Sequence, residues 1–529
     1  MPRRKRPRPH KPVSVHAAVP RRRALRLPDW AAWAGLCLAA AEFFRAKAFA
    51  ARPARIGDGW EYLVMACNWA RNFTPWVGRD ALVACARETD WPVEQALAGF
   101  IRHPQVGYDP FHFWLLSLLA APFSALCRAV GASQFYAFPL LHLAITFGVA
   151  WRLIRALGQA RAACLLLIMI SSPLIFWSNK AHSEFFVVSG VLLAFAVLYQ
   201  GRKLEAAFWL GLVANQQLTV APFAFGLVAW WFLSDRSRLR QWRAWLRALP
   251  PLAAPLLCPV YTELRYRLPS LINLAGTNDY SAISLRRALA LFIDPDIGLF
   301  PNWPLGLVLA MAAAACAVLL RKRLHGLGGM ALFTACWCLL LPLAMTIQTN
   351  WNSGGTVYIS RYALYQIPPV AVWFIVLIFR LAERWAPPPH SLPVAAAAAV
   401  AVCLVMWAPY RRNLAVFYPG QGERSGERTP FAEWIYERWP GLYDPPPEIF
   451  IERTLNTEQP SQYYGPGTWA VSNFSCSKLL LVRPLEQMRK MTAFDKPNGC
   501  YREIDFRAIA AGVVAGRIEP TPLGYINLP

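Results

Sequence analysis

The chain has 529 residues, of which 56% are hydrophobic and 16% are charged, and its formal net charge is +24. Soluble domains carry about 25% charged residues, so this composition argues against a soluble enzyme and indicates a membrane protein. The positive charge would also suit a nucleic-acid-binding protein, but no nucleic-acid-binding motif accompanies it, and we expect no nucleic acid among the partners.

Residues 1–29 form a basic arm. Ten Lys and Arg residues lie between Arg3 and Arg26, against the single acidic residue Asp29. A Pro- and Arg-rich segment of this kind does not bury enough apolar surface to fold. The positive-inside rule places it in the cytoplasm, near anionic membrane lipids. The apolar block that follows, residues 30–50, lacks a small-residue cleavage site, so we predict a retained first transmembrane helix rather than a signal peptide.

Eleven apolar blocks are long enough to cross a hydrocarbon core of about 30 Å. They are approximately residues 30–50, 111–127, 135–151, 162–177, 185–199, 206–233, 246–260, 303–320, 330–347, 362–380 and 392–407. With the N-terminus inside, eleven crossings place the C-terminal segment outside.

Two observations leave the helix count and the early topology open. Block 206–233 carries polar residues near its middle, from Asn215 to Thr219, so it forms either one broken helix or two short ones. Counting eleven spans also places Arg152, Arg155 and Arg161 on the external side, which conflicts with the positive-inside rule.

Three segments lie between or after these blocks, namely residues 52–110, 263–302 and 411–529. The first mixes charged with aromatic residues, which predicts short amphipathic helices at the membrane surface. The third holds 13 of the 30 acidic residues and predicts a separate α+β domain. In it we expect a helix over 430–439 and strands over 448–453, 468–474, 478–482 and 500–506. The predicted fold class is therefore an all-α polytopic membrane bundle over 30–410 with a small soluble C-terminal domain.

The twelve cysteines show no spacing typical of a metal site. Eight of them lie in apolar blocks, where Cys behaves as a small hydrophobic residue. Cys67 and Cys85 share the first external loop, and Cys476 and Cys500 share the C-terminal segment. Each pair would form a disulfide in an oxidising periplasm.

The first candidate for chemistry is Asp58, in the segment Gly57-Asp58-Gly59-Trp60-Glu61-Tyr62 directly after the first predicted span. Flanking glycines allow the backbone to approach a ligand, and a carboxylate at the membrane surface suits a general base. Glu61 would lie on the same face of a helix that starts at Asp58. The alternative is that Asp58 only caps this helix.

Other charged residues fall at the ends of later blocks. Asp109 either shares the catalytic cavity or caps the second span, and we favour the cap. Asp294 and Asp296 offer hard oxygen ligands to Mg²⁺ or Mn²⁺, or they form only a turn. His182 and Glu184 would be costly in lipid, so we expect them to face a cavity or an interface.

The Asp-Gly-x-Glu-Tyr element at 58–62 resembles multispanning glycosyltransferases of the GT-C superfamily, in particular bacterial aminoarabinose and mannosyl transferases that use polyprenyl-phosphate-linked sugars. Three further elements occur in the order found in that superfamily. They are Ser172-Pro173 with His182-Ser183-Glu184, then the Asp294 to Phe300 segment, then Trp351-Asn352-Ser353-Gly354-Gly355 running to Arg361-Tyr362. The resemblance covers roughly residues 30–407, and 356–360 departs from the Gly-rich stretch of the family.

The resemblance implies a transferase that moves a sugar from a polyprenyl-phosphate donor to an envelope glycan, lipid or protein acceptor. It would act on the periplasmic side of a bacterial inner membrane, with the N-terminus in the cytoplasm. Asp58 would deprotonate the acceptor hydroxyl, while Glu61, Asp109, Glu184 and Arg361 would bind substrate. The planar guanidinium of Arg361 matches two phosphate oxygens, although an arginine at this position also suits a snorkelling interface residue.

Two other classes of function stay open. A transporter or flippase of a lipid-linked or envelope precursor would need a route lined by charges or symmetric broken helices, and the two halves of the chain show no repeat. A non-catalytic scaffold of an envelope-assembly complex would also explain degenerate motifs joined to an extra domain.

Overall fold

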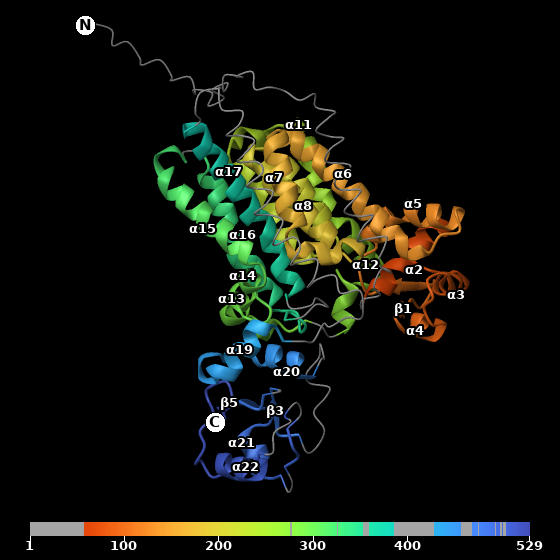
Figure 1. Cartoon of the computed structure of the whole chain (residues 1–529). Coiled ribbons are helices and arrows are strands. Elements are labelled where there is room, and N and C mark those ends of the chain that lie inside the picture. Colours follow the sequence, from red (N-terminus) through yellow and green to blue (C-terminus); the bar gives the residue numbers. More distant parts are fainter. Residues whose placement is uncertain are drawn as a thin grey trace, which may run out of the picture.

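The computed structural model describes residues 58–528, except 276–277, 325, 353–358, 386–427, 456–467, 474, 492–493, 498–499 and 501–503. The predicted basic arm and the predicted spans at 30–50 and 392–407 lie outside the described residues. Figure 1 shows a bundle of helices with a small helical body at one side of it and a separate C-terminal domain below it.

The bundle consists of helices, most of which run roughly along one another. They are α6 (Ala137–Leu157), α7 (Gln159–Ile170) with η3 (Pro173–Asn179), α8 (Glu184–Tyr199), α9 (Lys203–Ala214), α10 (Ala221–Leu233), α11 (Trp242–Ala253), α12 (Leu257–Tyr266), α15 (Pro304–Leu319), α16 (Gly328–Met345) and α17 (Ile367–Trp385). The shorter α13 (Leu285–Ile293) and α14 (Leu299–Asn302) lie near the C-terminal domain.

Three segments of the described chain are single helices long and apolar enough to cross a membrane: Gln134–Leu157, Gly328–Met345 and Arg361–Ala382. The pair α7 and η3 would form a fourth, although it is bent by 79°. Large apolar side chains are exposed along α11, α12, α15 and α16, for example Leu249 at 58% and Leu332 at 67%. In water such surfaces would be unfavourable, whereas in lipid they are the expected outer face.

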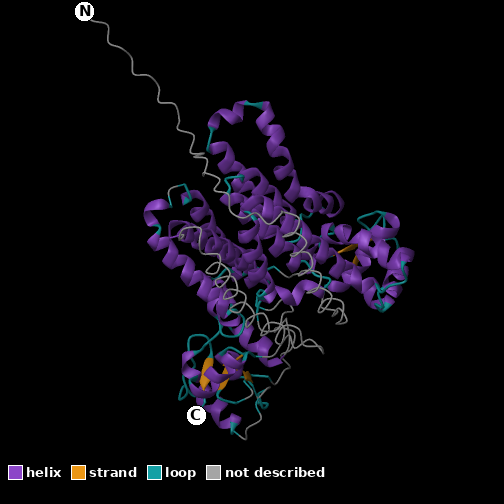
Figure 2. Ribbon diagram, turned by 45° about the horizontal axis from the view of Figure 1, so that its top comes forward, coloured by secondary structure: helices purple, strands orange, loops and turns teal. Residues whose placement is uncertain are grey.

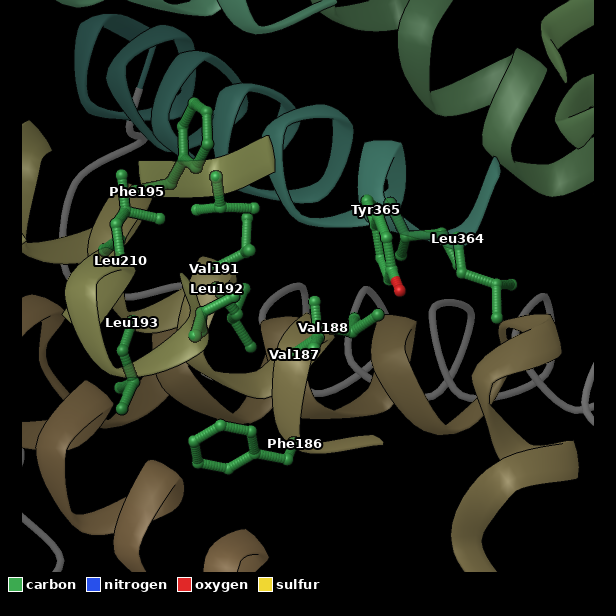
Figure 3. Close-up of a cluster of buried hydrophobic side chains, with 14 of the residues drawn as sticks. Phe186, Val187, Val188, Val191, Leu192, Leu193, Phe195, Leu210, Leu364 and Tyr365 are labelled. Atoms are coloured by element: carbon green, nitrogen blue, oxygen red, sulfur yellow. The ribbon is translucent and has the colours of Figure 1, made fainter. Parts of the chain in front are cut away.

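Helix α8 lies at the centre of the bundle and is apolar on every side. Its residues from Glu184 to Leu198 are buried, and Figure 3 shows Phe186 and Phe195 pointing to opposite sides of the helix, with Val191 and Leu192 between them. A helix that is hydrophobic all round has no face for solvent. It therefore packs against neighbours in every direction and positions Glu184, at its first turn, inside the protein.

Basic residues collect at one end of the bundle, which we call the basic end. Arg152, near the end of α6, lies 2.6 Å from Glu205 at the start of α9. Lys203, also at the start of α9, contacts Ser234 just after α10. Helices α6 and α10 therefore end where α9 begins, so α9 and α10 are antiparallel.

Block 206–233 was predicted to form either one broken helix or two short helices. The antiparallel arrangement of α9 and α10 shows that it forms two short helices. The turn between them contains Asn215, whose side chain donates to the carbonyl of Ala254 at 2.6 Å and accepts from the amide of Cys258 at 2.8 Å. Because the buried Asn215 side chain both donates and accepts a hydrogen bond, the helix can be interrupted here without leaving this amide unpaired.

Helix α5 (Leu115–Ala129) contains most of the second predicted span, but it stays in the side body. Ser117 donates to the carbonyl of Tyr62 in α2 at 3.1 Å, and Arg128 lies 3.6 Å from Glu88 in α3. Figure 1 shows α5 beside α2 rather than along the bundle. The first described helix that runs to the basic end is therefore α6, which brings Arg152 to the end that also carries the Arg236 to Arg240 turn.

The side body contains α2 (Gly59–Asn72), α3 (Arg79–Glu88), α4 (Val93–Ala98) and an antiparallel hairpin of β1 (Phe100–Arg102) and β2 (Tyr108–Pro110). The predicted Cys67–Cys85 disulfide is present and joins α2 to α3. The short helices predicted for this external segment are confirmed. The disulfide and the small core around it give α2 a rigid base.

The C-terminal domain is α+β, with an antiparallel sheet in the order β3-β4-β5 (Figure 2). Its elements are α19 (Pro430–Arg438), α20 (Pro447–Leu455), β3 (Ala470–Ser472), β4 (Lys478–Leu481), α21 (Leu485–Met488), α22 (Phe506–Val514) and β5 (Tyr525–Asn527). The predicted Cys476–Cys500 disulfide is present. The predicted helix at 430–439 and the centres of the strands at 468–474 and 478–482 are confirmed.

Two strand predictions in this domain are wrong in part or in full. Segment 448–453 is helical, and Ile449, Phe450, Glu452 and Arg453 are all buried, so the apparent alternation of apolar and charged residues does not mark one solvent face. In segment 500–506, residues 501–503 lie outside the described part, and Phe506 begins α22 after the cap residue Asp505. Strand β5 was not predicted.

Candidate functional site

Asp58 lies where four segments of the protein converge. His112 follows β2, His182 precedes α8, and Arg361 begins η10 (Arg361–Gln366). The Asp58 Oδ2 atom lies 3.2 Å from His112 Nε2, 3.7 Å from His182 Nε2 and 3.7 Å from Arg361 Nη1. Three nitrogen groups able to carry positive charge therefore surround a single carboxylate oxygen.

The structure excludes the reading in which Asp58 only caps a helix. Asp58 occupies the N-cap position of α2, but its side chain makes no capping hydrogen bond and instead turns toward the histidines and Arg361. The next residue, Gly59, lies so close to the Ala181 carbonyl that a Cβ atom would be 3.2 Å from its oxygen. Glycine at this position lets the start of α2 approach the segment that carries His182.

Each of the two histidines bridges Asp58 and a glutamate. Glu61 Oε2 lies 3.1 Å from His112 Nδ1 and accepts the His112 backbone amide at 3.2 Å. Glu184 Oε2 likewise contacts the Nδ1 atom of the His182 ring. The predicted residues Glu61 and Glu184 are therefore part of the Asp58 cluster. We define the Asp58 cluster as Asp58, Glu61, His112, His182, Glu184 and Arg361.

The charges of the cluster reinforce one another. Burial alone would raise the pKa of Asp58, but the charge and hydrogen bond of His112, with His182 and Arg361, hold it well below its usual value. Burial would lower the pKa of His112, yet Asp58 and Glu61 raise it well above its usual value. Glu184 and Asp58 likewise raise the pKa of His182. The cluster therefore stabilises the ionised form of Asp58 and the protonated forms of the two histidines relative to the same groups in water.

Arg361 lies inside the cluster rather than at a membrane interface. Its side chain is 11% exposed, with Nε 3.8 Å from Glu184 Oε1 and Nη1 3.3 Å from His182 Nε2. Its Nη2 donates to the Tyr362 hydroxyl at 2.9 Å. A snorkelling arginine would extend toward water, so this alternative does not describe Arg361.

A cavity of about 280 Å³ opens beside the cluster, and its lining includes His112, His182, Glu184 and Arg361. Gln216 and Gln217, from the break between α9 and α10, also line it. The volume lies near the lower end of the range for ligand pockets, about 300–1,000 Å³. Asp58 is not among the residues lining this cavity. Its side chain lies next to His112 and His182, which do line the cavity, and is 34% exposed.

Asp109 lies in neither of its two predicted places. It is fully buried, and its carboxylate accepts hydrogen bonds from Tyr261 at 2.5 Å, from Tyr266 at 2.7 Å and from Arg265 at 2.7 Å. The N-cap of α5 is Trp114, so Asp109 caps no helix. It joins the β1–β2 hairpin to the end of α12.

Asp294 and Asp296 join the bundle to the C-terminal domain. Asp294 accepts the Tyr443 hydroxyl at 2.9 Å on both of its oxygens, and Asp296 accepts the Thr429 amide at 2.8 Å. Arg428 Nη1 lies 3.7 Å from Asp296 Oδ2. In the described part of the chain, no three His, Cys, Asp or Glu side chains are grouped to hold a metal ion. The bonding of these two carboxylates fits the turn alternative.

This junction predicts a pH effect on stability. Burial and repulsion from Asp296 raise the pKa of Asp294 to about 7, whereas an unfolded chain releases this proton near pH 4. The protonated Asp294 carboxyl therefore contributes its full stabilisation of the folded protein below about pH 4, and this stabilisation is lost as the pH rises through about 7. Asp294→Asn keeps the acceptor for the backbone amides and cannot ionise. We expect its Tm, relative to wild type, to be higher at pH 8 than at pH 5, and a difference independent of pH would contradict this.

Sequence reasoning overlooked His112 as a member of the site. The sequence contains a signal for it, because a single histidine at the start of an apolar block is costly in lipid unless it has partners. His182 was expected to face a cavity, and this is confirmed. No sequence pattern indicates that both rings meet the same aspartate.

No family model matches the chain, and no curated protein matches it. Among solved structures, ArnT from Cupriavidus metallidurans bound to undecaprenyl phosphate is similar, with 14% sequence identity and a TM-score of 0.41. The similarity covers 74% of this chain and 75% of that chain. A likeness this distant assigns neither a family nor a function to the protein.

Proposed function

We propose that the protein is a membrane glycosyltransferase that moves a sugar from a polyprenyl-phosphate donor to an acceptor hydroxyl. The observation that carries this proposal is the Asp58 cluster, in which one partly exposed carboxylate faces Arg361 and two histidines beside a cavity. A base and an anion-binding group held together in this way suit the attack of a hydroxyl on a sugar whose leaving group is a phosphate.

The proposed topology places the basic end in the cytoplasm and the Asp58 cluster with the C-terminal domain in the periplasm of a bacterial inner membrane. Basic residues gather at one end, and two disulfides lie at or beyond the other. Both observations agree with the positive-inside rule and with an oxidising exterior.

In the proposed reaction, Asp58 takes the proton of the acceptor hydroxyl while the acceptor oxygen attacks the anomeric carbon. The bond from that carbon to the phosphate oxygen breaks, and the electron pair leaves with the phosphate. Arg361 and His182 stabilise the charge that develops on this group. The amide side chains of Gln216 and Gln217 would hold sugar hydroxyls in the cavity.

The proposal is tested by adding polyprenyl-phosphate-linked sugars to the full protein in nanodiscs, with a membrane extract as acceptor. Release of free polyprenyl phosphate together with a glycosylated product supports a transferase. A transporter would move the lipid-linked sugar without breaking its phosphate bond, and a scaffold would leave it where it is. Either result would overturn the proposal.

We expect Arg361→Gln to weaken binding of undecaprenyl phosphate by about 10- to 100-fold, because a charged hydrogen bond to phosphate contributes about 1.5–3 kcal/mol. Binding would be measured by titrating undecaprenyl phosphate into protein in nanodiscs. Arg102→Gln is the matched control, since this exposed residue of β1 lies outside the cluster. Equal affinity of the two variants would remove Arg361 from the donor site.

A further inference from the structure

The Asp58 cluster contains two matching chains of charge that meet at one atom. In the first, Glu61 holds His112 Nδ1 and His112 Nε2 faces Asp58 Oδ2. In the second, Glu184 holds His182 Nδ1 and His182 Nε2 faces the same oxygen. All four ring nitrogens therefore have a carboxylate partner.

The two chains differ at Nε2 of the histidine. His182 Nε2 lies 3.3 Å from Arg361 Nη1. In the described part of the chain, no hydrogen bond or ion pair joins Arg361 to His112. A phosphate held by Arg361 would therefore lie within reach of His182. The His182 side chain is 4% exposed and Glu184 is 2% exposed, so bulk water has little access to the proton on this ring.

We propose that His182 is a catalytic residue that passes a proton to the departing phosphate and is then reprotonated by Asp58. This inference rests on the proposed function and adds a role for a residue that a simple base mechanism does not need. It assigns to His112 a different task, which is to position the Asp58 carboxylate.

The protons balance over one turnover. The acceptor O–H bond breaks and an O–H bond forms on Asp58, while the His182 Nε2–H proton moves to an oxygen of the leaving phosphate. Asp58 then returns its proton to His182 Nε2, which lies 3.7 Å from Asp58 Oδ2 in the structure. The net transfer is from the acceptor hydroxyl to the phosphate, and no other reactant is required.

The surroundings of His182 favour this role. Its ring lies 4.7 Å from the Trp177 ring and 5.8 Å from the Tyr62 ring, measured between centroids. The charged or titratable groups that face it are Tyr62, Asp58, Glu184, Arg361 and His142. The two carboxylates raise the pKa of His182 despite its burial and the opposing charge of Arg361, and a carboxylate at each ring nitrogen favours the protonated ring.

The test uses ³¹P NMR of undecaprenyl phosphate bound to the full protein in nanodiscs, titrated with pH. An imidazolium near the phosphate lowers the pKa of that phosphate, because opposite charges within about 4–6 Å shift a pKa by one unit or more. We expect His182→Gln to raise the pKa of the bound phosphate by about one unit. His112→Gln should change it by much less.

Transfer rates supply the second readout. We expect His182→Gln to lower the rate by about 10²- to 10⁴-fold, which is the usual contribution of a proton-transferring group, and to change the pH profile of the rate. His112→Gln should lower the rate while keeping the shape of the wild-type profile, as expected of a positioning residue. If His182→Gln does not fold, Glu184→Gln tests the same chain of charge, because it removes the carboxylate that holds His182 Nδ1.

The outcomes separate the two proposals. If undecaprenyl phosphate does not bind to the wild-type protein, the proposed function fails. If it binds and His182→Gln leaves both the phosphate titration and the pH profile unchanged, the role of His182 is overturned while the proposed function stands. Equal effects of the His182 and His112 substitutions on the phosphate would also overturn the distinction between them.

Discussion

Asp58→Asn is expected to lower sugar transfer from a polyprenyl-phosphate donor by about 10³-fold or more, because it removes both the proton acceptor and its charge. The asparagine has the same shape, and its oxygen still accepts a hydrogen bond from His112. We therefore expect the variant to fold and to enter the membrane as the wild type does. The rate would be measured as release of polyprenyl phosphate by the protein in nanodiscs.

Asp80→Asn is the matched control, since Asp80 is an exposed aspartate of α3 in the same side body. The control should transfer at close to the wild-type rate. Binding of undecaprenyl phosphate to the Asp58→Asn variant should persist, because removing a negative charge beside Arg361 does not weaken an anion site. Transfer by Asp58→Asn at the wild-type rate would show that Asp58 is not the base.

Asp109→Ala is expected to destabilise the protein by about 3–5 kcal/mol, the usual cost of breaking a buried ion pair from one side. The substitution removes the partner of Arg265 and of two tyrosine hydroxyls, while Arg265 keeps a hydrogen bond to the Val106 carbonyl. The loss would be measured as a lower Tm in detergent, with Asp80→Ala as the control for an exposed aspartate.

This experiment also separates a structural role for Asp109 from a role in substrate binding. A structural role predicts a lower Tm with little change in KM for the donor at temperatures where the variant is folded. An unchanged Tm with a raised KM would instead return Asp109 to the substrate site, as the resemblance to GT-C enzymes first suggested.

Much of the secondary structure could be predicted from local composition. The apolar blocks in the described part of the chain coincide largely with helices, because main-chain polar groups inside an apolar environment must bond within their own segment. Both disulfide pairs could be expected because each lies within one short polar segment. The strand predicted at 448–453 failed because its charged residues are buried by partners from other segments, and Arg287 pairs there with Glu448.

The orientation of helices was less accessible to sequence reasoning. Helix α5 is as apolar as a spanning helix, with Leu126 50% exposed, and only its contacts with α2 and α3 show that it stays in the side body. Block 206–233 was ambiguous for the same reason. Hydropathy measures how strongly a segment avoids water, and it carries no information on which neighbour the segment packs against.

The sequence by itself determined that this chain avoids water over most of its length. It also determined where the basic residues lie between the apolar blocks, and that Asp58 follows the first apolar block. Only the tertiary structure decided that Asp58, His112, His182 and Arg361 form one cluster and that Asp109 and Asp294 have other partners. Arg361 and His182 are 179 positions apart. Contacts over such distances depend on how whole helices pack, and the pairing of buried charges follows from that packing rather than from any local pattern.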